Sequence, residues 1–586
     1  MKQFLKIVFG GLVALFLFFF LLILLFGAMM GTQEVAPRLA DKSLLVLDLS
    51  RPIADHQPYR SLSALLGEGL GEGVERRQRL RRVVTAIERA ADDDKVVGLY
   101  IKGQVVREGY HSGWAALKEV RRAIARFARS GKPVVTWQEE LDEATLYVVS
   151  PARRIVLHPL GLVEFNGLAA EVLYWAEAFE RYGIQAQVTR VGKYKSAVEP
   201  YVRRHMSPEN REQLGALLGD LFDEVVEAVA ADRKADAETL RRLSRQQGAL
   251  DAEEALRLGL VTEVGYYDRV LAQLRRLTGS EEGKPLKGRI DVSDYFDTLD
   301  EPDGGKVAVI YAEGMIVSGD GLEEVAGDRL ARLLRKARED DEVDAVVLRI
   351  NSPGGSATAS DVILRETERL KENKPLVVSM GSVAASGGYW IASQADEIWA
   401  QPNTITGSIG VFGLFFNVKR LINDHGLYME VVRTSPLADA LSLFRPKEER
   451  ELAIVQRFID KIYDRFVALV AQGRHLTPEQ VEALAQGRVW SGRRAKELGL
   501  VDHLGGLQQA VTAAAQRAGL GEDYAVEEYP KAREWVELLL EEMGLLPEEE
   551  SQGNPLEGLW RQLRALRHYD DPAGAYARMP FDLTIR

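Results

Sequence analysis

Short apolar runs alternate with amphipathic stretches along most of the chain. Residues 346–350, 376–379 and 397–400 are short runs rich in β-branched, aliphatic or aromatic side chains, which is typical of strands. Residues 361–372 and 451–471 carry apolar side chains at spacings of three and four residues, which is typical of helices. Strands that alternate with helices usually form parallel sheets covered by helices. The pattern therefore predicts an α/β fold.

One apolar run near the start of the sequence, residues 7–30, is much longer than these strands and contains no charged residue. As a helix it would be about 36 Å long, which is enough to cross a hydrocarbon core of about 30 Å. A secretory signal has a shorter apolar core of about 7–15 residues, followed by a cleavage site that is not evident here. Lys2 and Lys6 favour a cytoplasmic location for residues 1–6. We expect a transmembrane signal anchor, with the rest of the chain outside the cytoplasm.

Residues 42–278 and 305–520 have the pattern of two copies of one unit. GKPVV from Gly131 corresponds to NKPLV from Asn373, and a constant offset of 243 positions (393 − 150) pairs identical residues further on. These pairs are Ser150 and Ser393, Ala152 and Ala395, Ile155 and Ile398, Pro159 and Pro402, Gly167 and Gly410, Gly183 and Gly426, Val188 and Val431, and Arg190 and Arg433. So many matches at one spacing indicate an internal repeat. Between the copies, residues 279–304 are rich in Gly, Asp, Glu and Lys, which predicts a linker.

Charge and composition exclude several classes of function. The formal net charge of −12 argues against a nucleic-acid partner, because phosphate binding needs a basic surface. Residues 521–586 hold 15 Asp and Glu against 7 Lys and Arg, and we interpret them as an acidic, solvated helical extension. The chain has no cysteine, which excludes disulfides, thiolate metal sites and a cysteine nucleophile. The eight histidines show no metal-binding spacing, so we expect neither a metal nor another cofactor.

A candidate nucleophile follows the predicted strand at 376–379. Ser386 stands among small residues and opens a predicted helix that runs to about residue 395. A serine at this place is most often only a helix cap. In a catalytic interpretation, the backbone N–H of Gly387 and that of Gly354 or Gly355 would stabilise a developing oxyanion. Gly354 and Gly355 follow a neighbouring strand, so the two loops are expected to converge.

A serine nucleophile needs a base, and Lys195 is the best candidate. Burial would have to lower the pKa of this lysine by several units from about 10.4, and the nearby Val191, Tyr194, Ala197 and Val198 offer apolar surroundings. An ordinary surface lysine is the common alternative. A Ser–His–Asp triad assembled in space from the scattered histidines also stays open.

The two candidates lie in different copies of the repeat. The position equivalent to Ser386 is Glu143 or Ala144, and the position equivalent to Lys195 is Ala438. None of these can replace the candidate nucleophile or base. A site that uses both residues must join the two copies, either within one chain or between neighbouring chains. The apolar run at 411–416 is either a core strand or the lining of a pocket beside this site.

Four segments together resemble the long, two-repeat form of the signal peptide peptidase A family: NSPGGS (351–356), SVAASGGYW (382–390), TGSIGV (406–411) and VGKYKSAVEP (191–200). The resemblance implies a Ser/Lys dyad of Ser386 and Lys195, with Ser408 orienting the lysine. It implies a tandem of two Clp/crotonase-like β-β-α spiral domains and a serine endopeptidase that degrades signal peptides. It further implies a homotetrameric ring, anchored in the cell inner membrane with its catalytic part on the periplasmic side.

Two other interpretations fit parts of the sequence. A crotonase-like enzyme for acyl-thioesters would build a similar oxyanion hole on the same fold. A membrane scaffold without enzymatic activity would use the glycine-rich loops as plain turns. The location outside the cytoplasm and the combination of a lysine with a serine argue against the first. Covalent labelling of Ser386 by a serine-reactive fluorophosphonate separates the peptidase from both.

Overall fold

The computed structural model describes residues 39–56, 77–107, 109, 111–300, 302–321, 324–529 and 576–579. The predicted signal anchor at 7–30 lies outside these ranges, as do residues 1–6. Within the described ranges, no helix combines the length and the apolar character that crossing a bilayer requires.

The first copy of the repeat forms a parallel sheet with helices on both faces. Its strand order is β10 (Glu263–Val264), β6 (Arg154–Leu157), β5 (Val134–Gln138), β4 (Val96–Lys102), β1 (Ser43–Asp48) and β11 (Arg289–Asp291). Leu45 and Leu47 of β1 belong to the core formed with α3 (Leu80–Asp92), α4 (Trp114–Arg129), α5 (Glu143–Val149) and α8 (Pro208–Arg233). Leu44 and Val46 point to the other face, where α11 (Tyr267–Thr278) covers them.

The second copy repeats this order. Its parallel strands are β22 (His503–Leu504), β18 (Glu397–Ala400), β17 (Leu376–Ala385), β15 (Val343–Ser352), β12 (Gly305–Glu313) and β23 (Tyr524–Tyr529). One face packs on α13 (Gly327–Glu339), α14 (Ala357–Lys371), α15 (Gly387–Ala392) and α17 (Glu449–Arg474), and the other on α20 (Leu507–Arg517). The shared order confirms the α/β repeat. β15, β17, β18 and α17 include the strands and the helix predicted there, and α14 covers the other predicted helix except for its last residue, 372.

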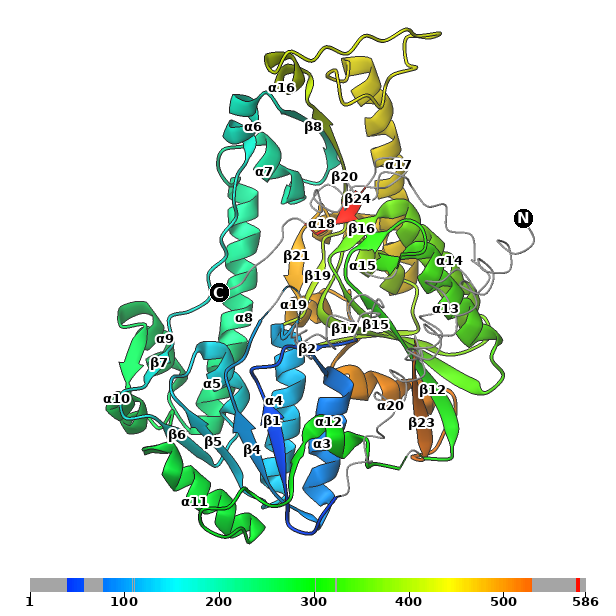
Figure 1. Ribbon diagram of the computed structural model, residues 1–586. Coiled ribbons are helices and arrows are strands. Elements are labelled where there is room, and N and C mark those ends of the chain that lie inside the picture. Colours follow the sequence, from blue (N-terminus) through cyan, green and yellow to red (C-terminus); the bar gives the residue numbers. More distant parts are fainter. Residues whose placement is uncertain are drawn as a thin grey trace, which may run out of the picture.

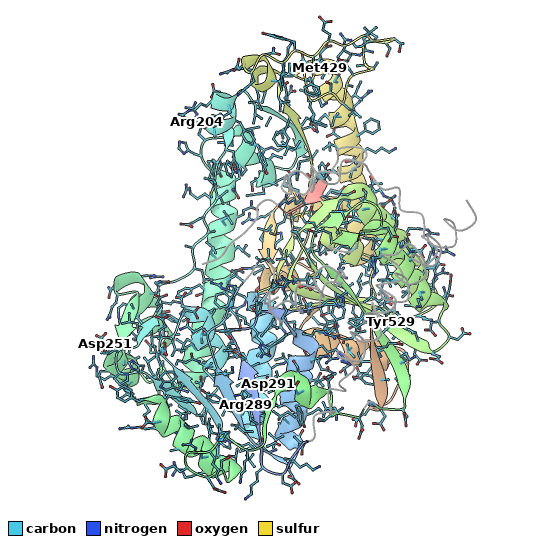
Figure 2. The ribbon with its side chains drawn as sticks, in the orientation of Figure 1. Arg204, Asp251, Arg289, Asp291, Met429 and Tyr529 are labelled. Carbon is cyan, nitrogen blue, oxygen red and sulfur yellow. The ribbon has the colours of Figure 1, made fainter. Side chains whose placement is uncertain are left out.

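The segments predicted as a linker and as a helical tail contribute strands to the two sheets. β11, followed by α12 (Val292–Phe296), lies within residues 279–304 and pairs with β1, and β23 pairs with β12 in the same way. Figure 2 shows Arg289 and Asp291 of β11 at the first sheet and Tyr529 of β23 at the second. For the described residues of the tail, the helical prediction is wrong, because residues 524–529 and 576–578 form short strands whose conformation depends on the strands that they pair with.

Smaller elements complete each copy. The first contains β2 (Ile53–Ala54), β3 (Gln78–Arg79), β7 (Leu162–Glu164), α6 (Ala176–Tyr182), the 3₁₀ helix Ser196–Val198, α7 (Glu199–Val202), α9 (Ala237–Gln246), β9 (Ala249–Asp251) and α10 (Ala252–Arg257). The second contains β19 (Ile405–Gly407), α16 (Lys419–Asp424), α18 (Pro478–Leu484), β21 (Val489–Ser491) and α19 (Gly492–Glu497). β19 pairs with β21 as β7 pairs with β9, and β19 also extends the second sheet beside β17.

A third sheet joins the two copies. Its order is β14 (Val325–Ala326), β13 (Ile316–Val317), β16 (Gly354–Ser356), β24 (Tyr576–Arg578), β20 (Val411–Asn417) and β8 (Gln185–Val191). β8 comes from the first copy and pairs antiparallel with β20 of the second over their full lengths. Figure 1 shows the long helix α8 rising from the first sheet toward this region. The pairing carries the chain that follows β8, including Lys195, to the second copy.

Candidate active site

Ser386 occupies a strained turn between the end of β17 and the start of α15. Its backbone has φ 56° and ψ −115°, a conformation that costs a non-glycine residue on the order of 1–3 kcal/mol. The turn is held on both sides, because the Ser386 N–H donates to the carbonyl of Gly407 at 2.8 Å and the Trp390 N–H donates to the carbonyl of Ser386 at 2.8 Å. Strain retained in this way is common at functional sites.

Lys195 reaches Ser386 from the other copy of the repeat. Its Nζ lies 2.7 Å from Ser386 Oγ, 2.9 Å from the carbonyl oxygen of Ser408 and 3.0 Å from Ser408 Oγ. The lysine is fully buried, and this desolvation lowers its pKa well below the ordinary value. A neutral amine has two N–H donors and one lone pair. When the Lys195 amine donates its two N–H groups to the two oxygens of Ser408, its lone pair is left to accept the Ser386 hydroxyl proton.

Two glycines that sequence analysis did not single out for this role enclose the lysine. A side chain at Gly487 would lie 2.6 Å from Lys195 Cβ, and one at Gly410 would lie 3.2 Å from Lys195 Cδ. Of the four apolar neighbours considered in the sequence, Tyr194 and Val198 are buried, whereas Val191 and Ala197 are half-buried. The second copy of the repeat therefore supplies part of the enclosure that desolvates Lys195, and nothing in the sequence around the lysine indicates it.

Gln213 of α8 fixes the lysine loop to the second copy. Its Nε2 donates to the carbonyl of Tyr194 at 3.0 Å and to Ser196 Oγ at 3.1 Å. Its Oε1 accepts the N–H of Val489 at 3.2 Å. All of these atoms are buried. Hydrogen bonds are stronger in such a low-dielectric environment, so these bonds hold the lysine loop firmly in position.

Ser408 has a positive φ of 54°, and its N–H donates to the carbonyl of Arg488 at 2.7 Å. This conformation directs both of its oxygens at the Lys195 amine. We expect Ser408→Ala to lower kcat by about ten- to a hundredfold, because one hydrogen bond of about 1–3 kcal/mol that orients the amine is lost. Steady-state kinetics and thermal unfolding check this together. An unchanged kcat with a lowered melting temperature would show that the hydroxyl only stabilises the turn.

Of the glycines proposed as oxyanion donors, Gly354 and Gly387 lie close together. β15 and β17 are parallel neighbours with Ser352 opposite Ala384. A side chain at Gly354 would lie 2.5 Å from the backbone nitrogen of Gly387. The Gly354 N–H already donates to Ser352 Oγ at 3.1 Å, which leaves Gly355 and Gly387 as the candidate donors.

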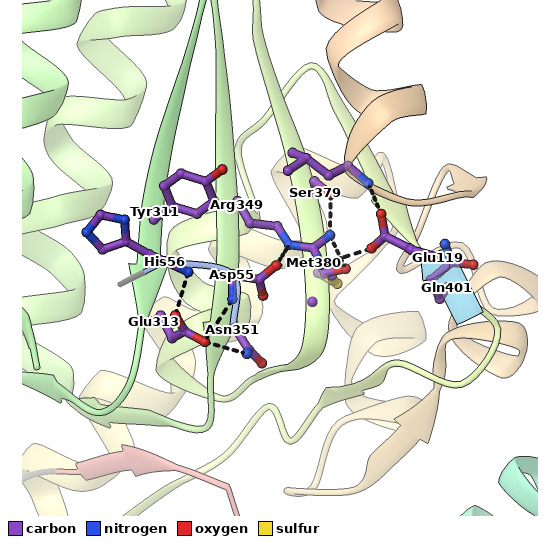
Figure 3. A network of polar contacts seen from close by, with 12 residues as sticks. Asp55, His56, Glu119, Tyr311, Glu313, Arg349, Asn351, Ser379, Met380 and Gln401 are labelled. Carbon is purple, nitrogen blue, oxygen red and sulfur yellow. Dashed lines mark hydrogen bonds and ion pairs between the residues drawn. The ribbon is translucent and has the colours of Figure 1, made fainter. Parts of the chain in front are cut away.

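A buried charge network ties the first copy to the strand that leads into the 351–356 turn (Figure 3). Arg349 donates to Asp55 Oδ1 at 2.9 Å, to Glu119 Oε1 at 2.9 Å and to Ser379 Oγ at 2.8 Å. Burial alone would lower the pKa of Arg349, but the two carboxylates outweigh it and raise the pKa.

Asn351 connects this network to the turn. Its Nδ2 donates to Glu313 Oε1 at 3.2 Å, and its Oδ1 accepts the Val383 N–H at 3.1 Å. Burial, helped by the charge of Asp55, raises the pKa of Glu313 to about 7. The contacts of Asn351 therefore hold both loops of the candidate oxyanion site, the turn at 351–356 and the segment from Val383 to Gly387.

Arg349→Met is expected to lower the free energy of unfolding by about 3–5 kcal/mol, because two buried carboxylates lose their partner. Urea denaturation measures the change. Arg365→Met is the matched control, since Arg365 pairs with Glu368 at the surface, where such a pair contributes about 0–1 kcal/mol. Equal effects of the two substitutions would contradict the structural role of the network.

The equivalent place in the first copy has a different chemistry. Glu143 Oε1 accepts the N–H of Gly167 at 2.6 Å, and burial raises the pKa of this carboxyl to about 7. Glu143 thus holds a loop in place where the second copy has Ser386. The run predicted at 411–416 is strand β20; Phe412 and Leu414 are buried with Val198 of the lysine loop.

Comparison with known proteins gives the same two-part organisation. The model of peptidase family S49 matches residues 126–281 and 368–521. Protease 4 from Haemophilus influenzae is 36% identical, over 96% of this chain and 95% of its own. Protease 4 from Salmonella typhi is 36% identical, over 82% and 79%. The chloroplastic serine protease SPPA of Arabidopsis thaliana is 32% identical, over 74% and 64%.

Among solved structures, a ClpP1 point mutant from Listeria monocytogenes matches with a TM-score of 0.24 and 17% identity. The match covers 35% of this chain and 94% of that chain. A score this low does not establish a shared fold.

Proposed function

The chain belongs to peptidase family S49 and is a serine peptidase, and from this premise we propose that it is an endopeptidase with a Ser386/Lys195 dyad. One observation carries the proposal: a fully buried lysine amine lies 2.7 Å from the hydroxyl of a serine in a strained turn. Both residues belong to the same chain, so in this proposal one chain contains a complete site.

The proposed reaction follows from the contacts of the amine. Neutral Lys195 accepts the hydroxyl proton while Ser386 Oγ attacks the carbonyl carbon of a peptide bond. The backbone N–H groups of Gly387 and Gly355 stabilise the resulting oxyanion. Lys195 then gives the proton to the leaving amine, and water hydrolyses the acyl-enzyme with the same lysine as base.

The pH dependence of this reaction follows from the lowered pKa of Lys195. Protonated lysine has no lone pair, so kcat/KM is expected to rise with pH and to level off once the amine is neutral. Because the pKa is lowered, this plateau begins well below the ordinary value of about 10.4 for lysine. A profile that still rises at about pH 10 would contradict a desolvated lysine base.

Labelling with a fluorophosphonate probe tests the nucleophile. We expect the probe to modify Ser386, as located by peptide mass spectrometry, and to leave Ser386→Ala unmodified. Ser382→Ala, four positions earlier, is the matched control and should still be labelled. A folded protein that is not labelled at Ser386 would contradict the assignment of Ser386 as the nucleophile.

We further propose that the substrates are signal peptides or other peptides released at the membrane. Support comes from the resemblance to signal peptide peptidase A and from the apolar run at 7–30, proposed as an inner-membrane anchor that places the catalytic part in the periplasm. Cell fractionation tests the anchor: the full chain should sediment with membranes, and a chain that begins at residue 42 should not.

The homotetramer is a proposal that rests on the same resemblance. Sedimentation of the chain that begins at residue 42 tests it, and a monomer that is fully active would contradict a requirement for the tetramer.

A further inference from the structure

A buried carboxylate beside the lysine loop takes no part in the proposed reaction. Glu199 lies four residues after Lys195, at the start of α7, and belongs to the segment 191–200 that carries part of the family resemblance. Only 1% of the residue is exposed. Burial of a carboxylate costs several kcal/mol unless polar or charged groups compensate it. A charge kept at this depth therefore needs partners.

Two groups compensate the charge of Glu199. One carboxylate oxygen, Oε2, accepts the backbone N–H of Ser207 at 3.1 Å. Ser207 is the N-cap of the 26-residue helix α8, whose positive end favours a nearby negative charge. The other oxygen, Oε1, has no hydrogen bond within the described part of the chain, and the guanidinium of Arg190 lies 3.8 Å from it. The carboxylate thus joins the end of β8 to the start of α8.

Arg190 in turn holds the backbone of the candidate base. Its Nη1, the nitrogen nearest to Glu199, donates to the carbonyl oxygen of Lys195 at 3.3 Å. Arg190 itself is fixed to the second copy of the repeat, because it lies opposite Phe412 in the pairing of β8 with β20. The contacts therefore run from Glu199 through Arg190 to the main chain from which the Lys195 side chain extends.

The second copy of the repeat, which lacks the lysine, also lacks this arrangement. The offset of 243 positions (433 − 190) places Arg433 at the position of Arg190 and Ser442 at that of Glu199. Arg433 instead donates to Asp439 Oδ1 at 3.0 Å. The arginine thus occurs in both copies, whereas the glutamate occurs only in the copy that holds the base.

We propose that Glu199 is a positioning residue for Lys195 and acts through Arg190. The inference rests on the proposed function, in which Lys195 is the base. With the carboxylate in place, the guanidinium is held at the Lys195 carbonyl, so the amine stays beside Ser386 Oγ and inside the enclosure that desolvates it. Without the carboxylate, the lysine loop loses this support, and the amine moves away from Ser386 and toward water.

The kinetics of Glu199→Gln measure the effect on the reaction. Glutamine keeps the size of the side chain and an oxygen that accepts the Ser207 N–H, but it removes the charge that holds Arg190. We expect kcat to fall by roughly ten- to a hundredfold, because a small displacement of a reacting group is enough for such a loss. KM should stay almost unchanged, since the proposed reaction gives Glu199 no contact with the peptide.

A double-mutant cycle tests whether Glu199 acts through Arg190. Arg190→Gln and the Glu199→Gln/Arg190→Gln double variant should lose kcat to the same extent as Glu199→Gln, because residues that act as a unit lose activity non-additively. The double variant buries no unpaired charge, so its comparison with Glu199→Gln still decides the question where Arg190→Gln alone does not fold. A further multiplying loss in the double variant would overturn action through Arg190.

The pH profile of kcat/KM separates positioning from a general loss of stability. Burial is what lowers the pKa of Lys195, so an amine that leaves its enclosure regains a higher pKa. The rise of kcat/KM should therefore move to higher pH in Glu199→Gln. Arg204→Gln is the matched control, because Arg204 is exposed and pairs with Glu180 at the surface (Figure 2). Its kcat and its profile should equal those of wild type.

The outcomes distinguish this proposal from the proposed function. An unchanged profile and kcat in Glu199→Gln, with or without lower thermal stability, would overturn the positioning role alone, because the dyad would then work without it. A wild-type protein that hydrolyses no peptide would overturn the proposed function as well.

Discussion

Ser386→Ala is expected to lower kcat for peptide hydrolysis by roughly 10³-fold or more, because the atom that would attack the carbonyl is removed. Folding should be unaffected, since the loss of one hydroxyl leaves almost no cavity and the turn keeps its backbone bonds to Gly407 and Trp390. Steady-state kinetics with a fluorogenic peptide and a urea unfolding curve measure the two quantities on the same sample.

A residual rate within about tenfold of wild type would contradict the assignment, since it corresponds to a change of only about 1.4 kcal/mol in the barrier. Ser382→Ala serves again as the control for a nearby serine and should keep its activity. A loss of activity together with a loss of folding would show a structural role for Ser386.

Lys195→Ala is expected to be as inactive as Ser386→Ala, and the double variant no worse than either, because residues that act as a unit lose activity non-additively. Lys195→Arg should not restore activity, since a guanidinium does not deprotonate in proteins. Independent, multiplying effects of the two single substitutions would contradict a dyad.

The stability of the Lys195→Met variant gives an independent test of whether Lys195 is desolvated in the folded protein. The folded protein disfavours protonation of Lys195, whereas the unfolded chain does not, so burial of the amine opposes folding at pH values below its ordinary pKa. Methionine removes this penalty at similar volume. The variant should therefore unfold at higher urea concentration than wild type near neutral pH, and the difference should shrink as the pH approaches about 10.4. An unchanged or lower midpoint would contradict a desolvated lysine.

The sequence alone predicts the elements and residues that have a recognisable local pattern. β15, β17 and β18 have the apolar runs of buried parallel strands, and the constant offset between identical residues shows the repeat that the two sheets reproduce. Ser386 and Lys195 were proposed as nucleophile and base from the segments around them and from the resemblance to a known family, and the repeat indicated only that a site using both must join the two copies. The structure then places them 2.7 Å apart within one chain, an arrangement that the sequence left open.

Elements and residues whose roles depend on partners far along the chain could not be predicted from the sequence. β11, β23 and β24 are short or charged strands whose conformation depends on the edges that they join. Gly487 encloses Lys195 although it lies 292 residues further along the chain (487 − 195). The sequence around Gly487 indicates only an ordinary turn glycine. No spacing along the chain encodes such contacts.

The most direct test of a dyad within one chain uses the two inactive variants together. Ser386→Ala and Lys195→Ala chains are unfolded, mixed in equal amounts and refolded, and peptide hydrolysis is measured against wild type treated in the same way. We expect no recovery beyond the sum of the separate variants, because every mixed assembly still lacks one residue in each chain. Recovery of a substantial fraction of wild-type activity would show that Lys195 of one chain serves Ser386 of another, and would contradict the site described above.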